Sequence, residues 1–373
     1  MDAPDETSRA PSQEPENPNC YLVHSLLNTI PVTELESPVL PEDSPVVTSQ
    51  TLVYSTVLDP LEQNLILRYL HSRCHSWNRL QTEGYVLGSG PHEVKRTPSK
   101  ASIEIYDFRS PPHTNIQAAG RINAIAIDCE MVGVRKGCQT LAFISAINFL
   151  TGEVLISRFV DPVEDVVDWR TKFSGITKTI MASAIISGAA FRSWREARDK
   201  LWEYMDDSTI LVGHSLNHDL EVLGMFHAKV VDSAILTAET VFPSIIPTKR
   251  LTRMWGLKRL AKDLLNLDIQ TSNRGHNALE DSYAARDIVI WCIRNPEELK
   301  LWAENARHQE EERKAAQSRN RHGKGRSKGK LPTIRSTQNW EYDSENDDYS
   351  EGFRLSDLAE ELGWPQGYDP WSD

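Results

Sequence analysis

Hydrophobic positions along the chain are densest between residues 122 and 294, and their spacing changes from that of strands to that of helices. Mostly apolar or alternating runs predict strands at 122–127, 141–149, 153–160, 210–213 and 229–232. Apolar residues three or four apart predict helices at 191–205, 216–226, 257–267 and 278–294. Three strands come first, and helices and strands then alternate before two closing helices. This order predicts an α/β fold with a mixed β-sheet flanked by helices.

The flanking segments differ in composition and divide the chain into four parts. Residues 1–50 are rich in proline, glutamate and serine. They carry too little apolar surface to offset the entropy of ordering, so disorder is predicted. An amphipathic helix followed by a linker is expected at 51–118, and the dense domain at 119–305. Residues 306–373 are basic and then acidic, which is typical of a disordered tail.

The helix ahead of the domain is predicted from a start signal and an apolar stripe. Asp59-Pro60 places a capping residue before a proline, which is favoured in the first helical turn. Apolar residues then recur at helical spacing at Leu61, Leu65, Tyr69 and Leu70. These four side chains are expected to form the apolar face of the helix.

Composition narrows the class of protein. The 373 residues include 41 lysines and arginines against 53 aspartates and glutamates, which gives a net charge of -12. This acidity argues against bulk charge as a source of affinity for nucleic acid, although bound divalent cations could make one face attractive to phosphate. No apolar run is long enough to predict a membrane span, and the first residues lack the pattern of a signal peptide. Five scattered cysteines without a CxxC pair indicate reduced thiols in an intracellular protein.

Asp128 and Glu130 follow a predicted buried strand as Asp-Cys-Glu. Side chains two apart in a strand share one face, so both carboxylates are expected to point the same way at the strand's end. Like charges that close repel unless a cation lies between them, and Mg²⁺ or Mn²⁺ prefers such oxygen ligands. Asp-x-Glu alone is common and is also compatible with no catalytic role.

Two further motifs place acidic residues near helix starts. Residues 213–219 (GHSLNHD) end a buried strand and begin a helix, and helix capping is the alternative to a chemical role for Asp219. His276 and Asp281 are five residues apart and do not share a face of a regular helix. They converge if His276 lies in the loop before a helix capped by Asn277, with Asp281 in the first turn. A histidine before a helix is otherwise an ordinary surface residue.

Together and in this order, Asp-x-Glu on a strand, Gly-His-x4-Asp at a strand–helix junction and His-x4-Asp on the closing helix are the three motifs of the DEDDh exonucleases. Further matching segments are 128–134 (DCEMVGV), 168–171 (DWRT), 174–177 (SGIT) and 257–261 (LKRLA). This half of the chain resembles the RNA exonuclease Rex group of that superfamily. The resemblance implies a ribonuclease H-like fold.

The resemblance also implies an activity and its residues. Asp128, Glu130, Asp219 and Asp281 would bind two divalent ions, Mg²⁺ or Mn²⁺, and His276 would be the general base. The position after His276 is asparagine, whereas a tyrosine there would mark the sister DEDDy group. The implied reaction is hydrolysis of single-stranded RNA from its 3′ end by a two-metal mechanism, releasing nucleoside 5′-monophosphates. The implied setting is RNA processing.

Contacts with the substrate are expected at Met131, Arg170 and His218. By resemblance, Met131 would pack on the terminal base, and the alternative is that it only fills the core. Arg170 would approach phosphate or ribose, and the alternative is an ion pair with Asp165 or Asp168. His218 would contact phosphate or only cap its helix. The second motif commonly ends His-Asn-Asp but here reads Asn-His-Asp, which affects the expected substrate range more than catalysis.

Two other functions compete with an exoribonuclease. One is a 3′→5′ exonuclease that acts on DNA, and the other is a non-catalytic RNA-binding module. The presence of all four acidic residues and of His276 argues against a non-catalytic module. The basic stretch 307–330 is a candidate nuclear localisation signal or RNA anchor, and the alternative is a disordered segment that only aids solubility. The nucleus or nucleolus is expected, with the cytoplasm as the alternative. Neither the natural RNA nor protein partners can be predicted.

Overall fold

The computed structural model describes residues 56–88, 100–113, 121–243, 249–272 and 275–323, with side chains as far as residue 316. These segments all belong to one compact unit, Pro45–Asp373. The disorder expected for residues 1–50 and for 324–373 concerns residues outside the described ones. None of the helices in the described segments has the length and hydrophobicity that crossing a membrane requires.

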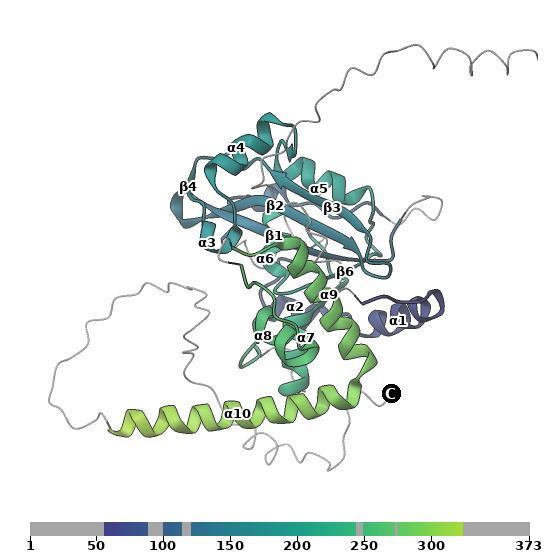
Figure 1. Ribbon diagram of the computed structural model, residues 1–373, viewed down its shortest axis with the longest axis vertical. Coiled ribbons are helices and arrows are strands. Elements are labelled where there is room, and N and C mark those ends of the chain that lie inside the picture. Colours follow the sequence, from purple (N-terminus) through teal and green to yellow (C-terminus); the bar gives the residue numbers. More distant parts are fainter. Residues whose placement is uncertain (1–55, 89–99, 114–120, 244–248, 273–274, 324–373) are drawn as a thin grey trace, which may run out of the picture. The chain divides into compact units, whose positions relative to one another are not determined.

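A seven-stranded mixed sheet forms the centre of the domain (Figure 1). Its order is β5-β3-β2-β1-β6-β7, and β4 also pairs with β1. The strands are β1 (Ala124–Val134), β2 (Gln139–Asn148), β3 (Val154–Val160), β4 (Val166–Asp168), β5 (Ala190–Phe191), β6 (Ile210–Gly213) and β7 (Val230–Asp232). β1, β2 and β3 are antiparallel neighbours, whereas β6 runs parallel to β1 and β7 parallel to β6. The predicted α/β class with a mixed sheet flanked by helices is confirmed.

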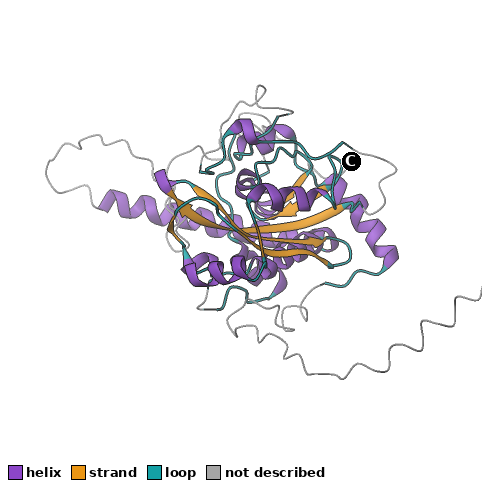
Figure 2. Ribbon diagram, turned by 90° about the horizontal axis from the view of Figure 1, so that it is seen from above, coloured by secondary structure: helices purple, strands orange, loops and turns teal. Residues whose placement is uncertain are grey.

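Helices cover both faces of the sheet (Figure 2). They are α1 (Pro60–Ser72), α2 (Trp77–Thr82), α3 (Thr171–Ser174), α4 (Lys178–Ile186), α5 (Trp194–Trp202), α6 (Asn217–Val222), α7 (Ser233–Val241), α8 (Leu257–Leu265), α9 (Ala278–Arg294) and α10 (Pro296–Gly323). Short 3-10 turns occur at η4 (Ile105–Asp107) and η5 (Arg135–Gly137).

The alternation of side chains along β1 decides what each face of the sheet carries. Ile125 and Ile127 belong to the core cluster that includes α5 and α6, whereas Ala124 and Ala126 belong to the cluster that includes α8 and α9. Because side chains two apart share a face, the positions that follow Ala126 on the same side point toward α9. The small alanines leave room for α9 to approach the sheet closely.

Helix α1 begins at the predicted residue, but the apolar face that it buries differs from the predicted one. Asp59 caps it by accepting hydrogen bonds from the backbone N–H groups of Leu61 and Glu62, at 2.9 and 3.0 Å. The buried side chains are Ile66 and Leu70, and the other three predicted apolar positions are exposed: Leu61, Leu65 and Tyr69. Two apolar stripes lie one residue apart on this helix. The sequence of α1 does not show which of them meets the core.

Described residues before 119 pack on the domain, so the domain boundary expected at residue 119 needs correction, and residues 100–113 of the expected linker contact the domain. Phe108 is buried with its ring centroid 5.3 Å from that of Phe226. The backbone N–H of Thr56 donates to the Asp287 carboxylate of α9 at 2.9 Å. The N-terminal arm, defined here as residues 56–88 and 100–113, therefore contacts the domain at several elements.

A chain that begins at residue 119 is expected to lose cooperative folding. Leu70, Leu80, Tyr85 and Phe108 are each no more than 1% exposed. Removing four such side chains forfeits about 6–12 kcal/mol of apolar burial, comparable with the 5–15 kcal/mol that stabilises a typical domain. Thermal unfolding followed by circular dichroism, beside a chain that begins at residue 50, tests this. A cooperative melt of the shorter chain within a few degrees of the longer one would contradict it.

Helix α10 extends through residues that were expected to be disordered. It runs from Pro296 to Gly323 and buries Leu299, Ala303 and Ala306 in the cluster shared with α9. The buried Glu310 carboxylate accepts hydrogen bonds from Arg253 at 2.6 Å and from Arg313 at 2.9 Å. Alanine, glutamate, lysine, arginine and glutamine favour helices wherever a face can be buried. The disordered-tail prediction for residues 306–323 was therefore wrong.

Candidate active site

Asp128 and Glu130 lie within β1 and share its α9 side. β1 continues to Val134, so the expectation that they stand at a strand's end was wrong. The apolar residues after Glu130 prolong the strand, with a register shift between Glu130 and Met131 where it pairs with β2. Two carboxylates thus project together from the interior of the sheet toward one helix.

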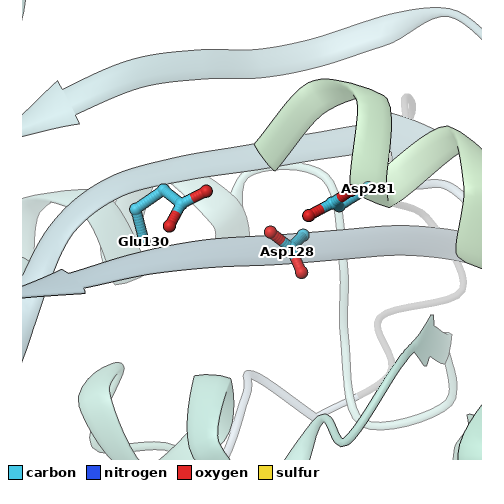
Figure 3. Close-up of side chains that lie close together, drawn as sticks. All are labelled: Asp128, Glu130 and Asp281. Atoms are coloured by element: carbon cyan, nitrogen blue, oxygen red, sulfur yellow. The ribbon is translucent and has the colours of Figure 1, made fainter. Parts of the chain in front are cut away.

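Asp281 completes a cluster of three carboxylates. Asn277 caps α9, and its side chain accepts a hydrogen bond from the backbone N–H of Leu279 at 3.0 Å. This cap places Asp281 in the first turn, over β1 (Figure 3). One carboxylate oxygen from each of Asp128, Glu130 and Asp281 lies within 4.8 Å of the others.

Asp219 approaches from α6 and is 4% exposed. It is not one of the three acids within 4.8 Å of one another. Its negative charge nevertheless raises the pKa of both Asp128 and Glu130, and hydrogen bonds with Cys129 tie its carboxylate to β1. Asp219 therefore lies beside the three-carboxylate cluster and contacts it through Cys129, which lies between Asp128 and Glu130 in β1.

Burial raises the pKa of all four acids, and the charges of neighbouring carboxylates raise them further. The pKa values of Asp128 and Glu130 lie well above the ordinary range, because of burial first and of neighbouring carboxylates second. Burial raises the pKa of Asp219 to about 8 and that of Asp281 to about 7. The Oδ1 atoms of Asp219 and Asp281 are buried and accept no hydrogen bond. The carboxylate oxygens, their negative charge and the two unsatisfied Oδ1 atoms are together suited to bind divalent cations such as Mg²⁺ or Mn²⁺.

His276 lies beside this cluster in the loop before α9. Its Nδ1 atom is 3.8 Å from Oδ2 of Asp281, and its side chain is 37% exposed. Burial, and then the charge of Lys258, lower the pKa of His276 below its ordinary value. The imidazole is therefore neutral near pH 7 and can accept a proton.

Residues 125–289 match a family model described as Exonuclease. This segment is an exonuclease domain. It contains all four acids and His276, whereas α1, α2 and α10 lie outside the matched residues. The resemblance to exonucleases that was inferred from the three motifs is therefore confirmed for this domain.

Several curated proteins are similar to this chain over part of its length. RNA exonuclease 3 of Candida albicans is 33% identical over 195 residues, covering 52% of this chain and 44% of the relative. Small RNA degrading nuclease 2 of Arabidopsis thaliana is 34% identical over 181 residues, covering 48% and 37%. RNA exonuclease 4 of Candida glabrata is 38% identical over 167 residues, covering 43% and 56%. The chain thus spans about half the length of these relatives.

Solved structures give a more distant comparison. The Neurospora crassa Pan2 catalytic unit (protease and nuclease domain) is 22% identical, with a TM-score of 0.43 over 57% of this chain and 33% of that one.

Gly275 determines where the exonuclease domain holds His276. Its φ angle is +101°, and a Cβ atom added there would lie 2.3 Å from the backbone nitrogen of Gly175. Gly275→Ala is expected to displace His276 and to lower kcat about 100-fold, because a shift near 1 Å costs that much. Gly188→Ala is the matched control, since its φ is +72° and nothing lies within 4 Å. Equal nuclease rates for the two variants would refute the role given to Gly275.

The three residues expected to contact substrate lie in different surroundings. Met131 is half-buried and packs on the core cluster of Ile125 and Ile127, on the face opposite Glu130. His218 is half-buried in α6, next to Asp219. Neither placement tests contact with substrate, which stays a prediction.

Arg170 makes neither of the ion pairs considered as alternatives. Its guanidinium donates to Oε1 of Gln139 at 2.9 Å, while its backbone N–H donates to the Asp168 carboxylate at 2.8 Å. Asp165 pairs with Arg135 at 2.8 Å instead. Arg170 is half-buried and has left-handed backbone geometry, with φ of 46°.

Asp232 is a residue whose role the sequence reasoning missed. Its carboxylate accepts hydrogen bonds from the backbone N–H groups of Ser215 and Leu216, both at 3.0 Å, and from the Tyr85 hydroxyl at 2.6 Å. It thereby holds the turn between β6 and α6, which positions Asp219. The signal was present, because an aspartate at the end of a strand, directly before a helix, is a common cap.

Proposed function

We propose that the exonuclease domain is a metal-dependent 3′→5′ exoribonuclease of the DEDDh type. It would shorten single-stranded RNA from the 3′ end and release nucleoside 5′-monophosphates. The observation that supports this most directly is the convergence of Asp128, Glu130 and Asp281 within 4.8 Å, with Asp219 adjoining them. Burial raises the pKa of all four acids, and the charges of Asp219 and Asp281 raise the pKa of Asp128 and Glu130 further, which costs stability unless cations offset the charge.

The residues have separate tasks in the proposed reaction. Asp128, Glu130, Asp219 and Asp281 would hold two Mg²⁺ or Mn²⁺ ions. Such ions supply an activated water and stabilise the leaving 3′ oxygen. His276, neutral near pH 7 and 3.8 Å from Asp281, accepts the proton of the attacking water at a ring nitrogen. Its partial exposure lets that proton pass on to solvent.

RNA is proposed as the substrate because the relatives described above are named as RNA exonucleases and a small-RNA-degrading nuclease. A DNA 3′→5′ exonuclease is the second candidate, since discrimination by the 2′-hydroxyl depends on contacts with bound substrate. A non-catalytic RNA-binding module is disfavoured because all five residues of the proposed chemistry lie together or adjoin one another.

The test is degradation of a 5′-labelled single-stranded RNA with Mg²⁺, with Mn²⁺ and with a chelator, beside Asp219→Ala. We expect a metal-dependent ladder that shortens from the 3′ end and is absent in the variant. A DNA oligomer of the same sequence should be digested more slowly. Faster digestion of DNA would replace the RNA substrate by DNA, and no activity on either, in a folded sample, would favour the binding module.

We also propose that the protein acts in the nucleus or nucleolus. The support is the basic stretch 307–330, whose end (residues 324–330) lies outside the described residues. Replacing Lys324, Arg326, Lys328 and Lys330 by glutamine in a fluorescent fusion should move the protein to the cytoplasm. An unchanged distribution would exclude this stretch as the signal.

A further inference from the structure

Tyr85 connects the N-terminal arm to the turn between β6 and α6. It is 1% exposed, and its hydroxyl donates to Oδ2 of Asp232 at 2.6 Å. The backbone N–H of Asn217, the first residue of α6, forms a hydrogen bond with the same hydroxyl. A single hydroxyl group thus links the arm to the end of β7 and to the start of the helix that carries Asp219. Tyr85 lies outside residues 125–289, which match the exonuclease family model.

The turn that Tyr85 supports has a strained conformation. Ser215 has a φ angle of 57°, in the left-handed region, and such a conformation persists only where its surroundings hold it. Oδ1 of Asp232 accepts from the backbone N–H of Ser215, and Oδ2 accepts from that of Leu216. Because Asp232 is only 1% exposed, solvent does not readily replace a lost donor. The Tyr85 hydroxyl therefore helps to orient the carboxylate that holds this turn.

The part of the arm around Tyr85 is itself firmly held. Nε2 of His75 accepts a hydrogen bond from the backbone N–H of Asp232 at 3.0 Å, and Nδ1 of His75 lies 3.3 Å from the Glu239 carboxylate of α7. The buried Arg79 guanidinium donates to Glu239 at 2.7 Å and to Glu83 at 3.0 Å. The arm thus contacts both the backbone and the side chain of Asp232, so the Tyr85 hydroxyl has a fixed support.

The position of Asp219 depends on how α6 begins. Asp219 is the third residue of this six-residue helix, and its Oδ1 atom accepts no hydrogen bond. A shift of the first turn of α6 would therefore move this carboxylate relative to Asp128 and Glu130. Groups that orient a metal ligand without touching the ion change metal affinity about 10- to 100-fold when they are removed.

We propose that Tyr85 is a positioning residue for the metal site, because its hydroxyl fixes the start of α6 and so places the Asp219 carboxylate beside Asp128 and Glu130. This inference rests on the proposed exonuclease function and adds to it a residue from outside the matched domain. The N-terminal arm then contributes to metal binding as well as to the stability of the fold.

The test is Tyr85→Phe in the full chain, since this substitution keeps the ring and removes only the hydroxyl. Isothermal titration of the metal-free protein with Mn²⁺ alone, without RNA, should show a dissociation constant raised about 10- to 100-fold. RNA shortening should slow at limiting Mg²⁺ and recover at high Mg²⁺, and KM for RNA should stay unchanged.

Tyr283→Phe is the matched control. Tyr283 is 5% exposed, and its hydroxyl donates at 2.7 Å to the carbonyl of Gly152, in the turn between β2 and β3. The variant loses one buried hydrogen bond of the same kind, at a turn that carries none of the four acids. Its dissociation constant for Mn²⁺ should stay within about twofold of wild type.

The opposing interpretation is that Tyr85 only stabilises the fold. Both variants would then lower the melting temperature and leave Mn²⁺ binding unchanged, and that result overturns the proposal.

Amide hydrogen exchange of the metal-free protein separates this inference from the proposed activity. Exchange in residues 214–222 should be faster in Tyr85→Phe than in wild type, and Tyr283→Phe should match wild type there. A wild type that shortens no RNA would refute the exonuclease, while Mn²⁺ binding and exchange still decide the role of Tyr85. Unchanged exchange of this segment in Tyr85→Phe overturns that role.

Discussion

Asp281→Asn is expected to lower kcat for RNA shortening by about 10³-fold or more. The substitution keeps the shape of a side chain whose oxygen lies within 4.8 Å of oxygens of Asp128 and Glu130, and removes its charge. Ion binding at such a site contributes several kcal/mol to transition-state stabilisation, and each 1.36 kcal/mol is about tenfold in rate. Release of 5′-monophosphates at saturating RNA and Mg²⁺ measures the effect.

Asp199→Asn provides the matched control for this substitution. Asp199 lies on α5, its side chain is 64% exposed, and its nearest ion-pair partner is Arg198 at 3.7 Å. The same chemical change there should leave kcat within about twofold of wild type, because exposed ion pairs contribute little. If Asp281→Asn retained a rate similar to that of Asp199→Asn, the carboxylate cluster would not be the reactive centre.

The second large effect is on thermal stability. Removing the charge of an acid in the site should stabilise the fold, although it should lower nuclease activity. Asp219→Asn should raise the melting temperature of the metal-free protein at pH 8 by about 2–10 °C, from a gain of about 1–3 kcal/mol. Burial raises the pKa of Asp219 to about 8, so ionising this acid disfavours the folded state. An asparagine of the same shape carries no charge and removes that cost.

The dependence on pH follows from the same pKa. An unfolded aspartate has a pKa of about 3.9, and the folded value for Asp219 is about 8. The folded state therefore holds the proton more tightly, and stability falls as pH rises from about 4 toward 8. The advantage of Asp219→Asn should shrink at pH 5, and Mg²⁺ should stabilise wild type more than the variant. A variant less stable than wild type in chelator at both pH values would contradict this account.

Much of the sheet and of the site could be predicted from local patterns. The shared face of Asp128 and Glu130 follows from strand periodicity alone. The placement of His276 before α9, with Asp281 in its first turn, follows from capping by Asn277. These features depend on residues that are near one another in sequence.

The features that could not be predicted depend on distant partners. Ile66 is buried in α1, while Leu65 is exposed, because the core cluster shared with α9 meets only one of two apolar stripes. Helix α7 was not predicted from the sequence because nearly all of its residues are buried. Its sequence therefore lacks the polar face that gives an exposed helix its 3.6-residue hydrophobic periodicity. The local sequence indicates that Asp232 can cap a helix, but not that it accepts a hydrogen bond from Tyr85, which lies 147 residues earlier in the chain.

Contacts of the N-terminal arm also determine when folding can be completed during synthesis. Thr56 binds Asp287, which is 231 residues later in the chain. At a synthesis rate of about 5–20 residues per second, the first part of the domain waits about 10–45 s for its last partner. During that interval Leu70, which belongs to the core cluster that includes α9, lacks part of the surface that buries it in the finished domain. Nascent chains of this protein should therefore need chaperones that shield apolar segments until α9 has emerged from the ribosome.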